Sequence, residues 1–243
     1  MPFTVVIPAR YASQRLPGKA LADIFGKPMI AHVVDRARES SAARVIVATD
    51  DDRIVSAVSN LNCEVCLTST EHQSGSDRIA EVVEKLAFED DEIVVNVQGD
   101  EPLIPGRLIN QVAAALEIAG DAVMSTAATA IKNDSDLQNP NVVKVVFSRN
   151  GKALYFSRAP IPYARDERLA SAWHHIGIYA YRASFLKRYD RLPRSTIEQT
   201  ECLEQLRVLD NGDTIMVEAI DYDTGIGVDT AEDLERVISL MSK

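Results

Sequence analysis

The stretch that decides the fold is VVIPARYASQRLPGK, residues 5–19. Its first three residues, Val5-Val6-Ile7, form the kind of short apolar run that makes a buried strand. The strand ends at Pro8 and enters a loop with two arginines, one lysine, two prolines and one glycine. In open α/β sheets, ligands bind at the carboxyl ends of the strands. The stretch therefore predicts a site for a polyanion, and a nucleoside triphosphate is the simplest candidate.

Working outward from this stretch, strand-like and helical patterns alternate through the first half of the chain. The expected strands are Val5–Pro8, Arg44–Asp50, Glu64–Leu67, Glu92–Gln98 and Val123–Ile131. The expected helices are Met29–Ser40, Arg53–Val58, Ser76–Ala87 and Gly106–Ala119. Such alternation predicts an α/β fold, with a mixed, mostly parallel sheet and helices on both of its faces.

The second half of the chain has a different pattern. Three strand-like runs with short or polar connections predict an antiparallel extension, a platform beside the main sheet: Val142–Phe147, Ala153–Arg158 and His175–Tyr181. The remaining expected elements are helices at Ala183–Tyr189 and Gln199–Asp210, a strand at Ile215–Ile220 and a helix at Ala231–Met241, with Thr230 as its N-cap. No linker separates two units, so we expect one domain over residues 1–243.

Composition narrows the functional classes. The formal net charge of −10 over 243 residues argues against a general nucleic-acid binder, which would carry a basic face. No apolar run has the length of a membrane span, and the N-terminus leads directly into a strand, so we expect a cytoplasmic protein with no membrane insertion. Cys63 and Cys66 are three residues apart on a predicted strand and so point to opposite faces, which favours core packing over a zinc or redox site.

Two acidic motifs follow predicted strands or precede a helix. Asn96–Pro102 reads Asn-Val-Gln-Gly-Asp-Glu-Pro, and it brings Asp100 to the same sheet edge as the basic loop. Mg²⁺ is commonly held by one or two carboxylates together with substrate phosphates, so Asp100 is a candidate ligand. Asp229, in Gly225–Thr230, is a candidate for the second ligand. The alternatives are a local cap for Asp100 and a favourable helix N-terminal charge for Asp229.

Other signatures are absent or weaker. The basic loop lacks the Walker A pattern, and no G-x-G-x-x-G follows the first strand. The polar run 73–78 offers Ser74, Ser76 and Arg78 for a base or ribose, and helix capping explains part of it. A D-x-D metal motif at Asp50–Asp52 is interpreted as the start of a helix.

These motifs in this order resemble the 3-deoxy-manno-octulosonate (Kdo) cytidylyltransferases, also called CMP-Kdo synthetases. The resemblance covers almost the whole chain, and it includes the following runs: Pro8–Lys19, Gly26–Met29, Val47–Asp50, His72–Arg78, Val95–Pro102, Tyr155–Arg158, His175–Tyr179, Leu203–Arg207 and Gly227–Leu234.

The resemblance implies a nucleotide-diphospho-sugar transferase fold, Mg²⁺, a homodimer, and formation of CMP-Kdo and pyrophosphate from CTP and Kdo for lipopolysaccharide biosynthesis. Residues 1–130 would form the nucleotide-binding half, and residues 131–243 the half that binds the sugar and dimerises. The implied nucleotide-binding residues are Ala9, Arg10, Arg15, Lys19, Ser74, Arg78 and Gln98, with Arg10, Lys19 and Asp100 as the catalytic residues. The implied metal ligands are Asp100 and Asp229. The implied sugar-binding residues are Gln98, Arg158, His175, Tyr179, Glu204 and Gln205.

The chain departs from the family pattern next to the implied sugar pocket. The segment 163–174 is shorter than expected, and His174 stands where an arginine is expected. The sequence therefore leaves three sugars open: Kdo, its 8-amino variant, and another acidic sugar such as sialic acid.

Overall fold

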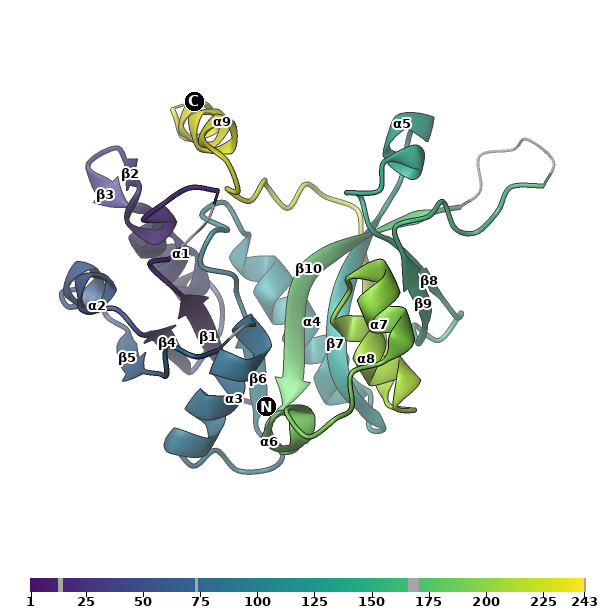
Figure 1. The fold of residues 1–243 in the computed structure, drawn as a ribbon, viewed down its shortest axis with the longest axis horizontal. Helices are drawn as coiled ribbons and strands as arrows, with labels where there is room; N and C mark the ends of the chain where they lie inside the picture. The colour runs from purple at the N-terminus through teal and green to yellow at the C-terminus, as the bar shows by residue number, and fades with distance from the viewer. Residues whose placement is uncertain (13–14, 73, 166–170, 243) are drawn as a thin grey trace.

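The computed structural model describes residues 1–12, 15–72, 74–165 and 171–242 (Figure 1). Residues 13–14 of the basic loop, residue 73 of the polar run, residues 166–170 of the short segment and residue 243 lie outside the described part. Within that part, no helix is long and apolar enough to cross a membrane.

A mixed sheet forms the centre of the molecule. Its strands are β1 Phe3–Ala9, β4 Arg44–Thr49, β5 Glu64–Leu67, β6 Ile93–Asn96, β7 Ala122–Ala130, β8 Lys144–Phe147, β9 Ala153–Ser157, β10 Trp173–Arg182 and β11 Thr214–Ile220. Two short strands, β2 Asp23–Ile24 and β3 Lys27–Pro28, form a separate hairpin. The helices are η1 Lys19–Leu21 (a 3₁₀ turn), α1 Met29–Arg38, α2 Asp52–Val58, α3 Gly75–Lys85, α4 Gly106–Ile118, α5 Asp134–Gln138, α6 Ala183–Tyr189, α7 Thr196–Glu201, α8 Gln205–Asp210 and α9 Ala231–Met241. The predicted α/β class is confirmed.

The main path of the sheet runs in the order β11-β7-β10-β6-β1-β4-β5. Of these seven strands, β10 alone runs antiparallel to its neighbours β6 and β7. The prediction that this strand belongs to a platform beside the sheet is therefore wrong for most of its length. Only its first residues, Trp173 and His174, pair with β8, which pairs in turn with β9 to form the antiparallel extension.

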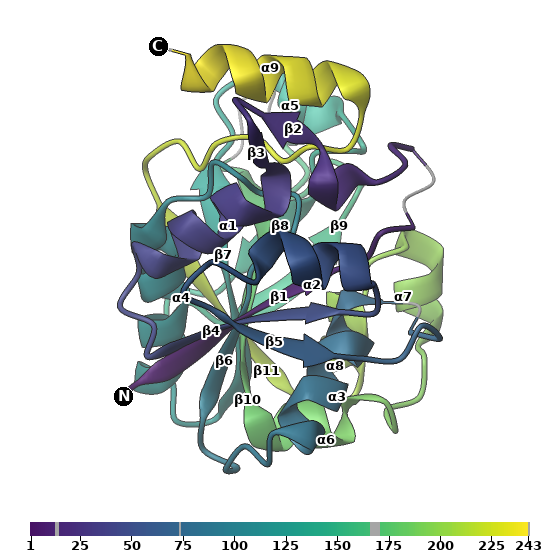
Figure 2. The ribbon, with the colours of Figure 1, turned by 90° about the vertical axis from the view of Figure 1, so that its left-hand side faces the viewer.

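Helices cover both faces of the sheet, as the alternating pattern predicts. One face packs against α1, α2 and α4, and the other against α3, α6 and α8. Successive residues of β1 alternate between the two cores, with Val5 and Ile7 on one side and Val6 on the other. Figure 2 shows α9 lying beside the β2–β3 hairpin, where Val237 packs against Ile24.

The predicted helix over Gln199–Asp210 is two helices. Cys202 ends α7 with a φ of 51°, in the left-handed region, and α8 begins three residues later. Cys202 is exposed. The turn brings the start of α8 toward β6 and β10, where a cavity lies.

Candidate functional site

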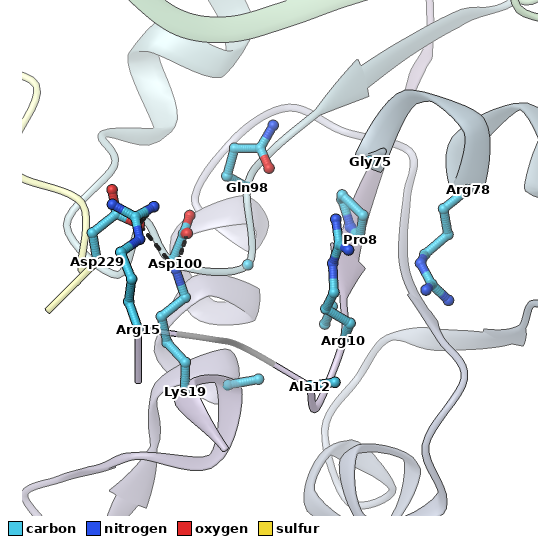
Figure 3. Close-up of a pocket in the computed structure, with 13 residues that line it drawn as sticks. Pro8, Arg10, Ala12, Arg15, Lys19, Gly75, Arg78, Gln98, Asp100 and Asp229 are labelled. Atoms are coloured by element: carbon cyan, nitrogen blue, oxygen red, sulfur yellow. Dashed lines mark hydrogen bonds and ion pairs between the residues drawn. The ribbon is translucent and has the colours of Figure 1, made fainter. Parts of the chain in front are cut away.

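A cleft of about 750 Å³ lies at the carboxyl ends of β1 and β6. It is lined by the basic loop, the start of α3, the turn after β6 and the segment before α9 (Figure 3). Its lining residues are Pro8, Ala9, Arg10, Ala12, Arg15, Lys19, Ala20, Gly75, Arg78, Gln98, Gly99, Asp100 and Asp229. Every residue implied for the nucleotide except Ser74 is among them, and so are both implied metal ligands.

Local structure carries Lys19 into this cleft. Gly18 has a φ of 68°, which suits a residue without a Cβ, and its N–H donates to the carbonyl of Tyr11 at 3.3 Å. The guanidinium of Arg53 stacks on the ring of Tyr11, 3.3 Å from the ring centre. The loop is therefore tied to α2 and closed on itself before Lys19 begins the 3₁₀ turn η1.

Lys19 bridges the two acidic residues. Its Nζ donates to Asp100 Oδ2 at 2.5 Å and to Asp229 Oδ1 at 3.2 Å. Arg15 donates to the same oxygen of Asp229 at 2.9 Å. Asp229 comes from the far end of the sequence, and it is placed because the N–H of Val228 donates to the carbonyl of Asp100 at 2.8 Å. Two carboxylates thus converge on one cation.

This donor set fits Mg²⁺. The ion takes oxygen ligands and is commonly bound by one or two carboxylates, with substrate phosphates and water completing its shell. Among the described residues there is no group of three or more acidic, histidine or cysteine side chains that could hold a metal. Asp100 and Asp229 supply two oxygen ligands of the kind that Mg²⁺ uses.

The turn after β6 approaches β1 closely. A Cβ added to Gly99 would lie 2.9 Å from the carbonyl oxygen of Pro8, so the backbone can pass there only without a side chain. A Cβ on Gly227 would lie 2.8 Å from Glu101 Oε1. Gly99 therefore lets the turn that carries Asp100 lie against the end of β1, and Gly227 lets the segment that carries Asp229 lie against that turn.

Two polar residues of the site, Arg78 and Ser74, make hydrogen bonds that hold the protein's own structure. Arg78 is only 3% exposed, and its guanidinium donates to Asp50 Oδ2 at 3.0 Å and to the hydroxyl of Thr68. Ser74 is the N-cap of α3, where its hydroxyl accepts from the N–H of Asp77 at 3.1 Å. Capping and ion pairing therefore account for much of the polar run from Ser74 to Arg78.

A second cavity, of about 270 Å³, adjoins the cleft, and Arg10, Gly75 and Gln98 line both. Tyr179, Glu204 and Gln205 line it, as implied for the sugar. Glu204 is exposed as a residue, yet the protein packed around its carboxyl group raises the pKa of that group, and the charge of Asp77 adds to the effect. The hydroxyl of Ser76 donates to Glu204 Oε2 at 3.4 Å.

The structure does not bring Arg158 and His175 into this second cavity. Arg158 donates to the carbonyl of Glu201 at 2.8 Å and to that of Pro140 at 3.0 Å. His175 lines a third cavity, of about 340 Å³, and its Nε2 lies 3.0 Å from the hydroxyl of Thr126. Burial lowers the pKa of His175 to about 3, so the ring is neutral. A sugar-binding role for these two residues stays a prediction.

Sequence reasoning missed several residues of the site. Tyr181, Tyr189 and Asn96 line the second cavity, and Glu101 lies next to the acidic pair. Burial, then the charges of Asp100 and Asp229, raise the pKa of Glu101 to about 7. The motif Asn96–Pro102 contained two of these residues, but no local pattern shows how deeply a side chain is buried.

Comparison with known proteins gives a consistent result. A family model described as "Cytidylyltransferase" matches residues 4–216. A protein of Tolumonas auensis named 3-deoxy-manno-octulosonate cytidylyltransferase is 56% identical over 98% of this chain and 96% of its own length. One of the same name from Histophilus somni is 53% identical over 100% and 99%. A solved CMP:2-keto-3-deoxy-manno-octonic acid synthetase complexed with CTP has a TM-score of 0.93 at 44% identity, covering 100% of this chain and 99% of that one.

Proposed function

Because the chain belongs to the family of 3-deoxy-manno-octulosonate cytidylyltransferases, we propose that it transfers the cytidylyl group of CTP to Kdo. The products are CMP-Kdo and pyrophosphate, and the reaction activates the sugar for lipopolysaccharide biosynthesis. This proposal includes the roles of the residues that line the cleft and the second cavity.

One observation carries the proposal. The cleft that holds Lys19, Asp100 and Asp229 opens into a smaller polar cavity through Arg10, Gly75 and Gln98. A nucleotide in the cleft and a sugar acid in the cavity would meet at these shared residues. The two substrates are both anions and repel each other, so bringing them side by side is the main difficulty of this reaction.

The reaction is a displacement at the α-phosphorus of CTP. The anomeric hydroxyl oxygen of the sugar forms the new bond to phosphorus and gives its proton to water. The bond from the α-phosphorus to the bridging oxygen breaks, and pyrophosphate leaves with the electron pair. Catalysis of such transfers consists mainly of positioning and charge neutralisation. Lys19, Arg15 and Arg10 supply positive charge to the triphosphate and to the departing pyrophosphate.

Asp100 and Asp229 would hold Mg²⁺, as the fit of their oxygens supports. When bound, this ion neutralises phosphate charge and increases the acidity of an oxygen that it contacts. Lys19 then has to exchange its carboxylate partners for phosphate oxygens. The basic loop is suited to that exchange because its lysine and Arg15 already face the cleft.

Two further parts of the proposal concern the setting. A homodimer is supported by the exposed apolar side chains of Leu154 and Tyr163, which are 63% and 86% exposed on and beside the antiparallel extension. A cytoplasmic location is supported by the proposed use of CTP, a nucleotide of the cell interior. Size-exclusion chromatography with light scattering tests the first, and cell fractionation tests the second.

The activity is tested by measuring pyrophosphate release from CTP and Mg²⁺, with Kdo or its 8-amino analogue in parallel reactions. Release with Kdo supports the proposal. Release with the amino sugar alone keeps cytidylyl transfer and overturns the choice of sugar. No release with either sugar, from folded protein that binds CTP, overturns the proposed function.

A further inference from the structure

The wall of the second cavity contains two buried side-chain atoms with no hydrogen-bond partner. They are Oδ1 of Asn96, at the end of β6, and Nε2 of Gln205, at the start of α8. Asn96 is 1% exposed and Gln205 is 5% exposed. Buried polar groups in folded proteins nearly always have a partner, so an unmet group in a cavity wall is completed by water or by a ligand that displaces it.

The two atoms have opposite polarity. Oδ1 can only accept a hydrogen bond, and Nε2 can only donate one. A hydroxyl group does both, whereas an ammonium only donates and a carboxylate or phosphate only accepts. The pair is therefore complementary to the hydroxyl groups of a sugar and to no single charged group.

Asn96 lies in the sheet beside an aromatic cluster of β10 and α6. The hydroxyl of Tyr181 is buried, which raises its pKa, and hydrogen bonding to the side chains of Ser76 and Asn96 partly offsets that effect. The ring of Tyr181 lies 6.0 Å from that of Tyr179 and stacks on that of Phe185 at 6.3 Å. Asn96 pairs with Tyr179 across β6 and β10, so its backbone position beside this aromatic cluster is fixed by the sheet.

Charge is distributed unevenly along the cavity. Arg10 lies where the cavity meets the cleft, and the acidic residue Glu204 forms part of the wall beyond the cleft, together with the uncharged Asn96, Gln205 and Tyr189. A sugar acid gains most by placing its carboxylate near Arg10 and its hydroxyl-bearing tail farther in. This orientation also keeps the anomeric end near the nucleotide.

We propose that Asn96 acts with Gln205 to recognise a hydroxyl group on the tail of the sugar, and that Asn96 is a specificity-determining residue of this protein. The inference rests on the proposed function, because it takes the sugar acid as the occupant of the second cavity. It predicts that, at this position, a hydroxyl group is favoured over hydrogen, and that Gln205 favours a hydroxyl group over an ammonium group. A tail that ends in an ammonium satisfies Asn96 but leaves Gln205 without a partner.

The test measures kinetics with CTP and four sugars: Kdo, its 7-deoxy and 8-deoxy forms, and the 8-amino form. In the unaltered protein, kcat/KM for at least one deoxy sugar should fall at least about tenfold, as expected when a buried hydrogen-bonding pair loses its partner. Asn96→Leu should raise KM for Kdo at least about tenfold with KM for CTP within about twofold. In this variant, kcat/KM for that deoxy sugar should be nearly equal to kcat/KM for Kdo.

Two more variants complete the test. Gln205→Leu should reduce the preference for Kdo over the 8-amino sugar. Gln199→Leu, on the exposed side of α7, is the matched control. It should change neither the preference for Kdo over the deoxy sugar nor that over the 8-amino sugar. If the unaltered protein accepts both deoxy sugars as well as Kdo, the inference is overturned without use of any variant. It is also overturned if Asn96→Leu keeps full discrimination. Failure of the unaltered protein to use Kdo would instead overturn the proposed function.

Discussion

Replacing Lys19 by glutamine should have opposite effects on metal binding and on turnover. In the structure, Lys19 is a cation already bound between Asp100 and Asp229, and its side chain is only 16% exposed. A divalent ion that binds without nucleotide has to displace it. A triphosphate removes that obstacle, because it offers the ammonium group other oxygens. Metal and CTP should therefore bind cooperatively in the natural protein.

The size of the effect follows from the two contacts. The bond to Asp100, 2.5 Å long and largely buried, is worth about 1.5–3 kcal/mol as a charge-assisted hydrogen bond. The bond to Asp229, whose side chain is 49% exposed, adds only about 0.2–1 kcal/mol. The sum is an upper limit, because water replaces part of it. We expect Lys19→Gln to tighten Mn²⁺ binding without nucleotide by about tenfold, and by no more than several hundredfold, at about 1.4 kcal/mol per tenfold.

The assay pairs Mn²⁺ titration, followed by electron paramagnetic resonance, with pyrophosphate release. Turnover should fall about 100-fold or more, because the transition state loses a preorganised positive group. Lys27→Gln is the control, since Lys27 pairs with Asp35 outside the cleft and the change in net charge is the same. Unchanged or weaker Mn²⁺ binding in Lys19→Gln would show that this lysine does not compete for the two carboxylates.

The remaining predictions concern three other residues. Asp100→Asn should abolish turnover in Mg²⁺ while the protein stays folded by circular dichroism, and near-normal pyrophosphate release would refute its role as a ligand. Burial holds the pKa of His175 at about 3 in the folded protein. As the pH falls below about 6.5, this histidine therefore binds a proton in the unfolded chain but not in the folded one. The free energy of unfolding should then fall by up to about 1.4 kcal/mol per pH unit, down to about pH 3. Urea unfolding at pH 6 and pH 5 gives the slope of the free energy of unfolding against pH. That slope should be smaller in His175→Gln than in the unaltered protein by about the same amount. Equal slopes in the two proteins would contradict the reasoning. Arg207→Met should lower the free energy of unfolding by about 3–5 kcal/mol, because it leaves buried Glu198 without its ion-pair partner; a loss below about 1 kcal/mol would show that the pair is not needed.

The sequence predicted the first half of the fold because each element there is set by a local pattern. A helix that covers one face of the sheet needs apolar residues at fixed spacings, and α1, α3 and α4 have them. These three helices begin and end within two residues of the predicted bounds. The cleft followed for a similar reason, since loops after parallel strands meet at one edge of a sheet.

Long-range pairing was outside the reach of such patterns. Nothing within residues 173–182 shows that this strand pairs with β6 and β7 rather than with β8 alone. Likewise, the sequence shows that Arg158 carries a charge but not that backbone carbonyls at the end of α7 satisfy it. Burial of Asn96 and Glu101 depends on neighbours from distant segments, which explains why both were missed.

The position of β10 has a consequence for how the protein is made. A nascent chain that has left the ribosome only as far as Ala130 contains β6 and β7, yet the strand that lies between them has not been synthesised. Both strands then expose an open edge, which is the feature of a sheet most prone to pair with other chains. About fifty more residues must emerge before β10, which ends at Arg182, can fill the gap between β6 and β7. The first half of this protein therefore cannot finish folding on its own during translation.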